Sequence, residues 1–208
     1  KVAGGPLIEF DEQRVPDWTY LWEGDFESLA TLMVEHVRAV VKRYRGRVNL
    51  WQVASRINRG RVLALTEEQR LQIVARAVRT AREIDSRTPI VVSFDQPWAE
   101  YMAHEQVELA PLHFADALVR ADLGLSGLGI EFNMGYWPHG SLSRTPLAFS
   151  RLIDQWVRLE LPLMITITTP SSIETDDKAT GNSRVRGESS VDRASQREWV
   201  ERYLPLLF

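Results

Sequence analysis

Short apolar segments alternate with amphipathic helical stretches along nearly the whole chain, and this pattern constrains the fold more than any other feature. Such alternation is typical of a parallel β-sheet covered by helices. The expected strands are residues 6–10, the stretch 47–58 around Trp51, and residues 90–95, 128–133 and 163–168. The run 90–95 is almost continuously apolar, as in strands that are covered on both faces. The pattern therefore predicts an α/β fold with five strands.

The helical stretches begin with capping signals. Asp25 precedes a stretch whose apolar residues recur at helical spacing, so it is expected to be an N-cap. Thr66 and Gln69 have the spacing of a capping box, and Thr145 with the following proline is typical of a helix start. The expected helices are 26–44, one from residue 66, 111–121, one from residue 145 and one from about residue 195.

The composition favours one domain, residues 1–208, and excludes several kinds of partner. With 208 residues and 44% hydrophobic content, the chain can bury one sizeable core. A net charge of −3 predicts no nucleic-acid partner, and no apolar run approaches the roughly 20 residues that span a bilayer, so no membrane partner is expected either. There is no cysteine, and the histidines show no metal-ligand spacing. We therefore expect no metal and no cofactor.

Two segments stand apart from the alternating pattern. Residues 170–192 contain almost no large apolar residue, which predicts a mobile loop within the domain. Lys1 already lies in a strand-like pattern, and we therefore expect the chain to be a piece of a longer protein.

Polar side chains gather at the C-terminal ends of the expected strands. Glu9, Asp95 and Glu131 lie at three of these ends, and Arg56 follows the strand around Trp51. In parallel α/β proteins the carboxyl ends of the strands form the edge where chemistry is done. The sequence therefore places its candidate site at this edge.

The helix and strand HVRAVVKRYRGRVNLWQVASR resemble the fourth unit of the family-10 glycoside hydrolases, the xylanase family. Three other segments, KVAGGPLIEFDEQRVPDW, LSGLGIEFNM and LPLMITITT, are similar to the family's third, sixth and seventh strands, and the tail ASQREWVERYLPLLF resembles the helix that follows. The resemblance implies an incomplete TIM (β/α)₈ barrel, about strands 3 to 7 with their helices. The remaining barrel strands would come from sequence outside this chain. It also implies a secreted or extracytoplasmic protein that acts on a β-linked polysaccharide or oligosaccharide.

The chain departs from the family at its essential positions. The family's acid/base glutamate falls on Arg56 and its nucleophile on Ile167. An arginine cannot donate a proton at working pH, and an isoleucine cannot form a glycosyl ester. Glu131 replaces a family glutamine. The resemblance therefore predicts that the standard retaining hydrolysis is lost. The other departures are at Gly5, Phe10 and Asn133, where the family has histidines.

Three functional interpretations remain open. In the first, the cleft survives as a carbohydrate-binding surface, with aromatic rings that stack on sugar faces and polar groups that bind hydroxyls. The expected binding residues are Gln52, Arg56, Asn133, Trp18, Trp22, Trp98 and Trp137. In the second, the catalytic carboxylates have moved, and Glu131 works with Asp95 or Glu9. In the third, the chain is a purely structural domain.

Several of these residues also allow a purely structural reading. Arg56 could bind an anionic sugar such as a uronate, or form an internal salt bridge to Glu9 or Glu131. Asp95 could cap the turn that follows it. The tryptophan-rich loops could pack on the missing barrel strands instead of on sugar, while Trp51 is expected in the core.

Overall fold

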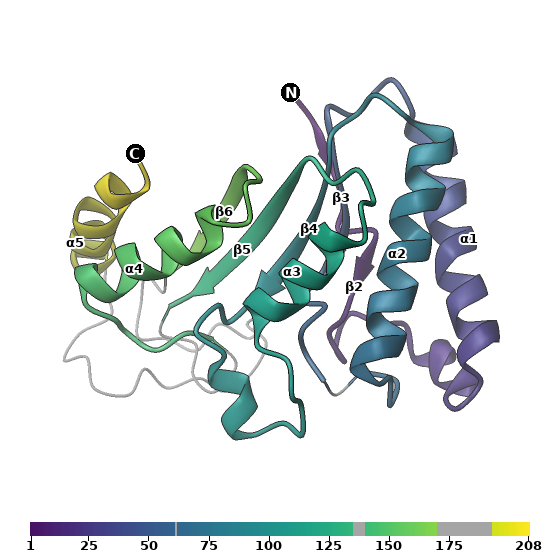
Figure 1. Cartoon of the computed structure of the whole chain (residues 1–208), viewed down its shortest axis with the longest axis horizontal. Helices are drawn as coiled ribbons and strands as arrows, with labels where there is room; N and C mark the ends of the chain where they lie inside the picture. Colours follow the sequence, from purple (N-terminus) through teal and green to yellow (C-terminus); the bar gives the residue numbers. More distant parts are fainter. Residues whose placement is uncertain (61, 135–139, 170–192) are drawn as a thin grey trace.

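The computed structural model describes residues 1–60, 62–134, 140–169 and 193–208. Its parallel strands form one sheet in the order β1-β3-β4-β5-β6, with β2 also paired to β3. Helices connect the strands and lie along one side of the curved sheet, from α1 and α2 at one end to α4 and α5 at the other (Figure 1). The sheet is a half-barrel, which confirms the expected α/β class and the incomplete TIM barrel.

The strands and helices follow one another as the sequence predicts. The strands are β1 (Ala3–Gly4), β2 (Ile8–Glu9), β3 (Leu50–Ser55), β4 (Ile90–Asp95), β5 (Gly127–Asn133) and β6 (Leu163–Thr168). The helices are α1 (Phe26–Tyr44), α2 (Glu67–Ile84), α3 (Pro111–Arg120), α4 (Pro146–Val157) and α5 (Arg193–Tyr203). Short 3₁₀ helices are η1 (Asp17–Trp22), η2 (Glu100–Ala103) and η3 (Leu204–Leu207).

The first expected strand, residues 6–10, is shorter in the structure, where only Ile8–Glu9 form β2, and the separate strand β1 precedes it. β1 and β2 both pair with β3, at Ala3↔Leu50 and at Ile8↔Ala54. Between them, Pro6 has no N–H to donate to the ladder, and Gly5 has a φ of +129°. A Cβ on Gly5 would lie 2.2 Å from the Gln52 carbonyl oxygen, so only glycine fits here.

The helix starts are confirmed by their hydrogen bonds. The Asp25 side chain accepts from the Ser28 N–H at the start of α1. At α2 the Thr66 hydroxyl accepts from the Gln69 N–H, and the Gln69 side chain accepts from the Thr66 N–H. These bonds satisfy backbone donors that the first turn of a helix leaves free.

The core lies between the sheet and its helices. Trp51 is 1% exposed, and its indole N–H donates to the Asp85 carboxylate at the end of α2, at 3.0 Å. Phe132 of β5 packs against Phe149 of α4, with ring centroids 4.9 Å apart. All six residues of β4 are buried, as its apolar run predicts.

The expected mobile loop, 170–192, lies outside the described residues. Among the helices that the structure does describe, none combines the length and the apolar character needed to cross a membrane.

Candidate functional site

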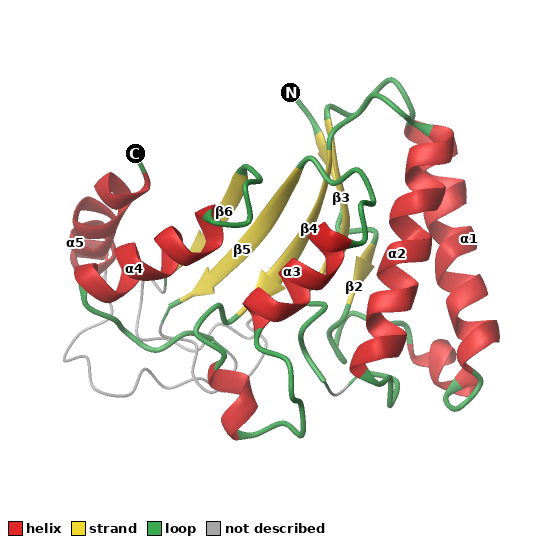
Figure 2. Ribbon diagram, viewed as in Figure 1, coloured by secondary structure: helices red, strands yellow, loops and turns green. Residues whose placement is uncertain are grey.

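The candidate site lies at the carboxyl end of the sheet, where loops and short helical turns gather (Figure 2). Because every strand pair is parallel, the C-terminal residues of neighbouring strands meet at one edge. Glu9 ends β2, Asp95 ends β4, and the paired residue Glu131 lies near the end of β5. The structure therefore brings together the three carboxylates that the sequence places at strand ends. We call this edge the mouth.

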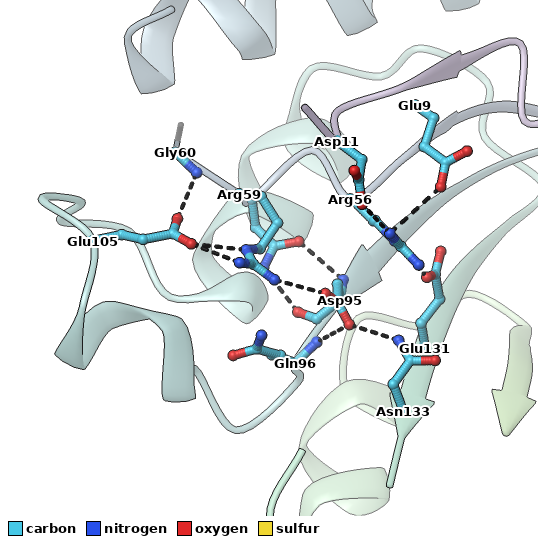
Figure 3. A network of polar contacts seen from close by, with 11 residues as sticks. Glu9, Asp11, Arg56, Arg59, Gly60, Asp95, Gln96, Glu105, Glu131 and Asn133 are labelled. Carbon is cyan, nitrogen blue, oxygen red and sulfur yellow. Dashed lines mark hydrogen bonds and ion pairs between the residues drawn. The ribbon is translucent and has the colours of Figure 1, made fainter. Parts of the chain in front are cut away.

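Arg56, the residue that follows β3, holds three carboxylates at the mouth (Figure 3). Its Nε donates to Glu131 at 3.2 Å, and one terminal nitrogen contacts Asp11 and lies 3.6 Å from Glu9. The Arg56 side chain is 19% exposed and that of Glu131 is 13% exposed. We call Arg56, Glu9, Asp11 and Glu131 the Arg56 cluster. Its pairs Arg56–Glu9 and Arg56–Glu131 are the internal salt bridges that the sequence allowed as an alternative to sugar binding.

The backbone turns sharply where β3 and β4 end. Arg56 has a φ of +55°, and Gln96, the residue after β4, has a φ of +46°. This left-handed conformation is unfavourable for a residue with a Cβ, at about 1–2 kcal/mol. It persists only where surrounding contacts compensate, and at Arg56 these contacts are the three carboxylates.

A second guanidinium organises the neighbouring loops. Arg59 contacts Asp95 at 2.9 Å and donates twice to Glu105, at 3.0 and 2.7 Å. The other Glu105 oxygen accepts from the Gly60 N–H at 2.7 Å. Glu105 is 5% exposed and Asp95 is 2% exposed. We call Arg59, Asp95 and Glu105 the Arg59 cluster; it ties the loop after β3 to the loop after β4.

Asp95 is held by neutral donors as well as by Arg59. One of its oxygens accepts from the Asn133 side chain at 3.0 Å and from the Gln96 N–H at 2.8 Å. The Asn58 side chain bonds both the N–H and the carbonyl of Asp95. Asp95 does bond the start of the following turn, as its structural reading expects, and it also accepts from Asn133 on β5, the strand that carries Glu131.

The electrostatics of the mouth are dominated by its carboxylates. Burial raises the pKa of Glu131 to about 7, because its removal from water, with the negative charges of Asp95 and Glu9, outweighs the stabilising charge of Arg56. Burial acts to lower the pKa of Arg56, but the four carboxylates around it hold that pKa above its ordinary value. Arg56 therefore stays charged, and Glu131 is the group that exchanges a proton near neutral pH.

Gln52 lies deeper in the half-barrel than the Arg56 cluster. Its side-chain amide donates to the Ser93 hydroxyl on β4 at 2.7 Å. On the next strand, a Cβ on Gly129 would lie 2.0 Å from this hydroxyl oxygen, so glycine leaves room for the contact. Gln52 is half-buried. No described residue donates to its side-chain oxygen, so this oxygen can accept a hydrogen bond from a ligand.

Exposed aromatic side chains lie on η1, in the loop that follows β2. Trp18 is 53% exposed, Trp22 is 42% exposed and Tyr20 is 37% exposed. Burial raises the pKa of Tyr20, and nearby carboxylates, including Asp11 of the Arg56 cluster, raise it further. Asp11, a member of the Arg56 cluster, belongs to the same loop as these rings. We call Trp18, Tyr20 and Trp22 the η1 platform.

Trp98 has a different environment from the η1 platform. It is half-buried, its ring lies edge-on to Phe132 at 5.3 Å, and the Arg144 guanidinium lies over it at 5.4 Å. Part of the Trp98 ring is therefore covered by the core and by the Arg144 guanidinium. Trp137, the remaining expected sugar-stacking residue, lies outside the described residues.

Ile167 pairs with Phe132 in the ladder between β5 and β6. Alternate residues of a strand point to opposite faces, so Ile167 faces the helices as Phe132 does, while the neighbouring pair Thr166 and Glu131 faces the barrel interior. Ile167 packs against the hydrophobic core. Its side chain is therefore not part of the mouth.

The sequence matches no protein-family model and no curated protein sequence. The structure, in contrast, is similar to solved xylanases. A GH10 xylanase from Thermobacillus composti superposes with a TM-score of 0.65 at 19% identity, over 99% of this chain and 59% of that one. This is the fold of part of a xylanase barrel. The endo-1,4-β-xylanase from Caldicellulosiruptor owensensis gives a TM-score of 0.64 at 17% identity, over 99% of this chain and 61% of that one.

A third similar structure is xylanase 10B from Thermotoga maritima, with a TM-score of 0.60 at 18% identity over 85% of this chain. The chain spans 53% of that xylanase, so it corresponds to a little over half of the whole enzyme. At these identities the likeness establishes the xylanase fold of the half-barrel. The chemistry of its mouth has to be argued from the residues that it contains.

The sequence did not identify four residues of the mouth as site residues. Asp11 lies two residues beyond Glu9, and Arg59 lies three residues beyond Arg56, so their nearness to strand ends was an available signal. Asn58 follows the same strand, but a polar residue after a strand does not by itself indicate a site residue. Glu105 carries no such signal, because it is distant in sequence and reaches Arg59 across two loops.

The mouth contains the buried carboxyl group of Glu131, which can donate or accept a proton. It also contains carboxylates that are paired with the guanidinium groups of Arg56 and Arg59. Over the described part of the chain, no group of three histidine, cysteine or acidic side chains is arranged to hold a metal ion. The described residues therefore offer hydrogen bonding and proton exchange at Glu131, beside an aromatic surface.

Proposed function

We propose that the mouth of this half-barrel recognises a β-linked polysaccharide or oligosaccharide without the two-glutamate hydrolysis of the xylanase family. The observation that carries this proposal is the Arg56 cluster. One guanidinium engages Glu9, Asp11 and Glu131 together, so a positive charge lies where a retaining enzyme needs a free nucleophile and a proton donor.

Two further observations support a sugar as the ligand. The fold is that of enzymes described as xylanases, and the exposed rings of Trp18 and Trp22 lie on the loop that also carries Asp11. Flat aromatic surfaces bind the apolar faces of sugar rings, while half-buried amides such as those of Gln52 and Asn133 bind hydroxyl groups. We further propose that sequence outside this chain supplies the other barrel strands.

A second candidate function is hydrolysis by relocated carboxylates. It is favoured by the pKa of Glu131, which burial raises to about 7, because general acids work best when their pKa is near the working pH. Glu9 is the stronger candidate partner, since it shares the Arg56 guanidinium with Glu131 and the two carboxyl groups are therefore close. Asp95 is 2% exposed and already holds Arg59 and Asn133.

The test is a paired measurement on the full-length protein with xylan and mixed β-glucans. Binding is followed by calorimetry, and release of reducing ends is scored in the same samples. Our proposal expects binding without release. Release that disappears in the Glu131→Gln variant would establish the second candidate, and absence of both binding and release would leave a purely structural role.

A further inference from the structure

Arg56 has no two neighbouring nitrogen atoms that are both free to donate to an acidic sugar, because its Nε and Nη1 are already paired and only Nη2 has no partner among the described residues. Its Nε and one terminal nitrogen already donate to Glu131 and Asp11, and Glu9 lies beside the same nitrogen. A carboxylate ligand binds arginine best through two parallel N–H groups. A uronate that binds Arg56 through two parallel N–H groups would therefore have to displace a carboxylate that the protein already holds.

Arg59 is committed more fully than Arg56, because all three of its nitrogen atoms are paired. Its Nε and one terminal nitrogen donate to Glu105, and its other terminal nitrogen donates to Asp95. Both of these carboxylates are almost fully buried. Removal of either partner would leave a buried charge without compensation, so Arg59 cannot turn toward a ligand at low cost.

The mouth also carries an excess of negative charge. The Arg56 and Arg59 clusters contain more carboxylates than guanidinium groups, and they do so even when Glu131 is protonated. The same sign of charge continues onto the η1 platform. The carboxylates that act on Tyr20 are Glu12, Glu23, Asp17 and Asp11. An acidic ligand would approach like charge from both sides.

From these contacts we infer that the mouth selects uncharged sugars over uronic acids, and that the internal pairing of Arg56 sets this selectivity. The inference rests on the proposed function, because it names the class of sugar that the same site takes. A neutral sugar meets hydroxyl-binding groups and aromatic rings at no electrostatic cost. A uronate meets repulsion that a hydrogen bond to Arg56 does not offset, because one nitrogen of each parallel pair is occupied and only a single-point contact is left.

The test compares two ligands that differ in one charged group: a β-1,4-xylo-oligosaccharide bearing a glucuronic acid branch and the same oligosaccharide bearing a glucose branch in its place. Calorimetry on the full-length protein at low salt should show the acidic ligand binding about tenfold more weakly. The ratio of the two affinities should approach one at high salt, where screening reduces the repulsion.

The variant Asp11→Asn should raise the affinity for the acidic ligand relative to the neutral one by about tenfold, because it removes one negative charge that pairs with Arg56. Glu9→Gln is a second variant with the same expected direction, in case Asp11→Asn folds poorly. The matched control is Glu83→Gln, which makes the same charge change at an exposed position on α2 and should leave the ratio unchanged.

The possible outcomes separate the inference from the proposed function. If the two ligands bind wild type equally well, or the acidic one binds more tightly, the selectivity is wrong while sugar recognition stands. If the ratio is as expected but Asp11→Asn and Glu9→Gln both leave it unchanged, the role of Arg56 pairing is wrong. If neither ligand binds, the proposed function itself fails.

Discussion

Arg56 is the residue on which the charges of the mouth depend. Without its guanidinium, Glu9, Asp11 and Glu131 would face one another without a counter-charge. Removal of one partner from a largely buried ion pair costs about 3 kcal/mol or more. We therefore expect Arg56→Met to lower the free energy of unfolding by about 3 kcal/mol, measured by chemical denaturation at neutral pH.

The control for this variant is Arg120→Met, which removes an exposed ion pair with Asp116. Exposed pairs contribute about 0–1 kcal/mol, so this change should be small. Equal losses in the two variants would show that the Arg56 cluster contributes no more to stability than an ordinary surface ion pair.

Glu131 predicts a dependence of stability on pH. Its pKa is about 7 in the folded protein and 4.5 for the unperturbed group. Between pH 4.5 and pH 7 the folded protein therefore holds a proton on Glu131 that the unfolded chain releases. The stability that this group contributes is fully present below pH 4.5 and is lost as the pH rises through 7. Relative to Glu131→Gln, the wild-type protein should therefore lose about 2–3 kcal/mol between roughly pH 5 and pH 8.

The measurement is a pair of denaturation series, one for each protein, across this pH range. Subtracting the two series removes the contributions of groups that titrate alike in both proteins. If the difference in the free energy of unfolding stays constant with pH, burial does not raise the pKa of Glu131 as described.

At the residue scale, the sequence predicts the parts of the site that lie on strands. Glu9, Asp95 and Glu131 were expected together because parallel strands end at one edge, and the structure brings them together. The role of each in binding or catalysis stays a prediction. Glu105 could not be predicted, because its contact with Arg59 depends on the shapes of two loops, which carry no periodic signal.

At the scale of elements, the start of α2 depends on its capping box. Thr66→Ala removes the acceptor for the Gln69 N–H, and loss of such a cap costs about 1 kcal/mol. Thermal or chemical denaturation should show this loss. Glu83→Ala, an exposed change on the same helix, should stay within about 0.5 kcal/mol of wild type. Similar losses in both variants would argue against the cap.

The loops at the mouth are expected to open together when Glu105 is removed. Glu105→Ala deletes both bonds to Arg59 and the acceptor of the Gly60 N–H. Hydrogen exchange at the Gly60 amide should become faster, since its protection depends on this carboxylate. Glu108→Ala is the control in the same loop, because Glu108 is exposed. Unchanged exchange at Gly60 in Glu105→Ala would contradict the role assigned to the Arg59 cluster.

The sequence predicts the helices and strands well because their signals are local. The capping residues and the apolar periodicity of α1 and α2 are properties of adjacent residues, and the structure confirms both. The interruption between β1 and β2 was not predicted. It depends on the close approach of Gly5 to the Gln52 carbonyl on another strand, and this contact has no local signature.

At the scale of the whole molecule, the η1 platform supplies three exposed aromatic side chains of the described half-barrel. Trp18→Ala should weaken sugar binding about tenfold, or about 1.4 kcal/mol, because it removes a ring that stacks on the ligand. Leu21→Ala is the matched control, since Leu21 is 83% exposed on the same short helix and has no ring. Equal effects in calorimetry would mean that the platform does not bind sugar through its rings.

The overall fold was predictable only in part from physical patterns. Alternating strands and helices indicate a parallel sheet, but its curvature into a half-barrel was expected from the resemblance to xylanases and not from periodicity. The likeness in structure at 19% identity confirms that expectation for the fold. The loss of the family's two glutamates remains a proposal. It rests on Arg56, because the side chain of Ile167 faces the helices and lies outside the mouth.

The most direct test of the account is the paired calorimetry and reducing-end assay of the full-length protein on xylan. The account predicts heat of binding without release of reducing ends, because Arg56 pairs with the carboxylates that hydrolysis would need. Release of reducing ends by the wild-type protein, abolished in Glu131→Gln, would contradict it and assign hydrolysis to the mouth.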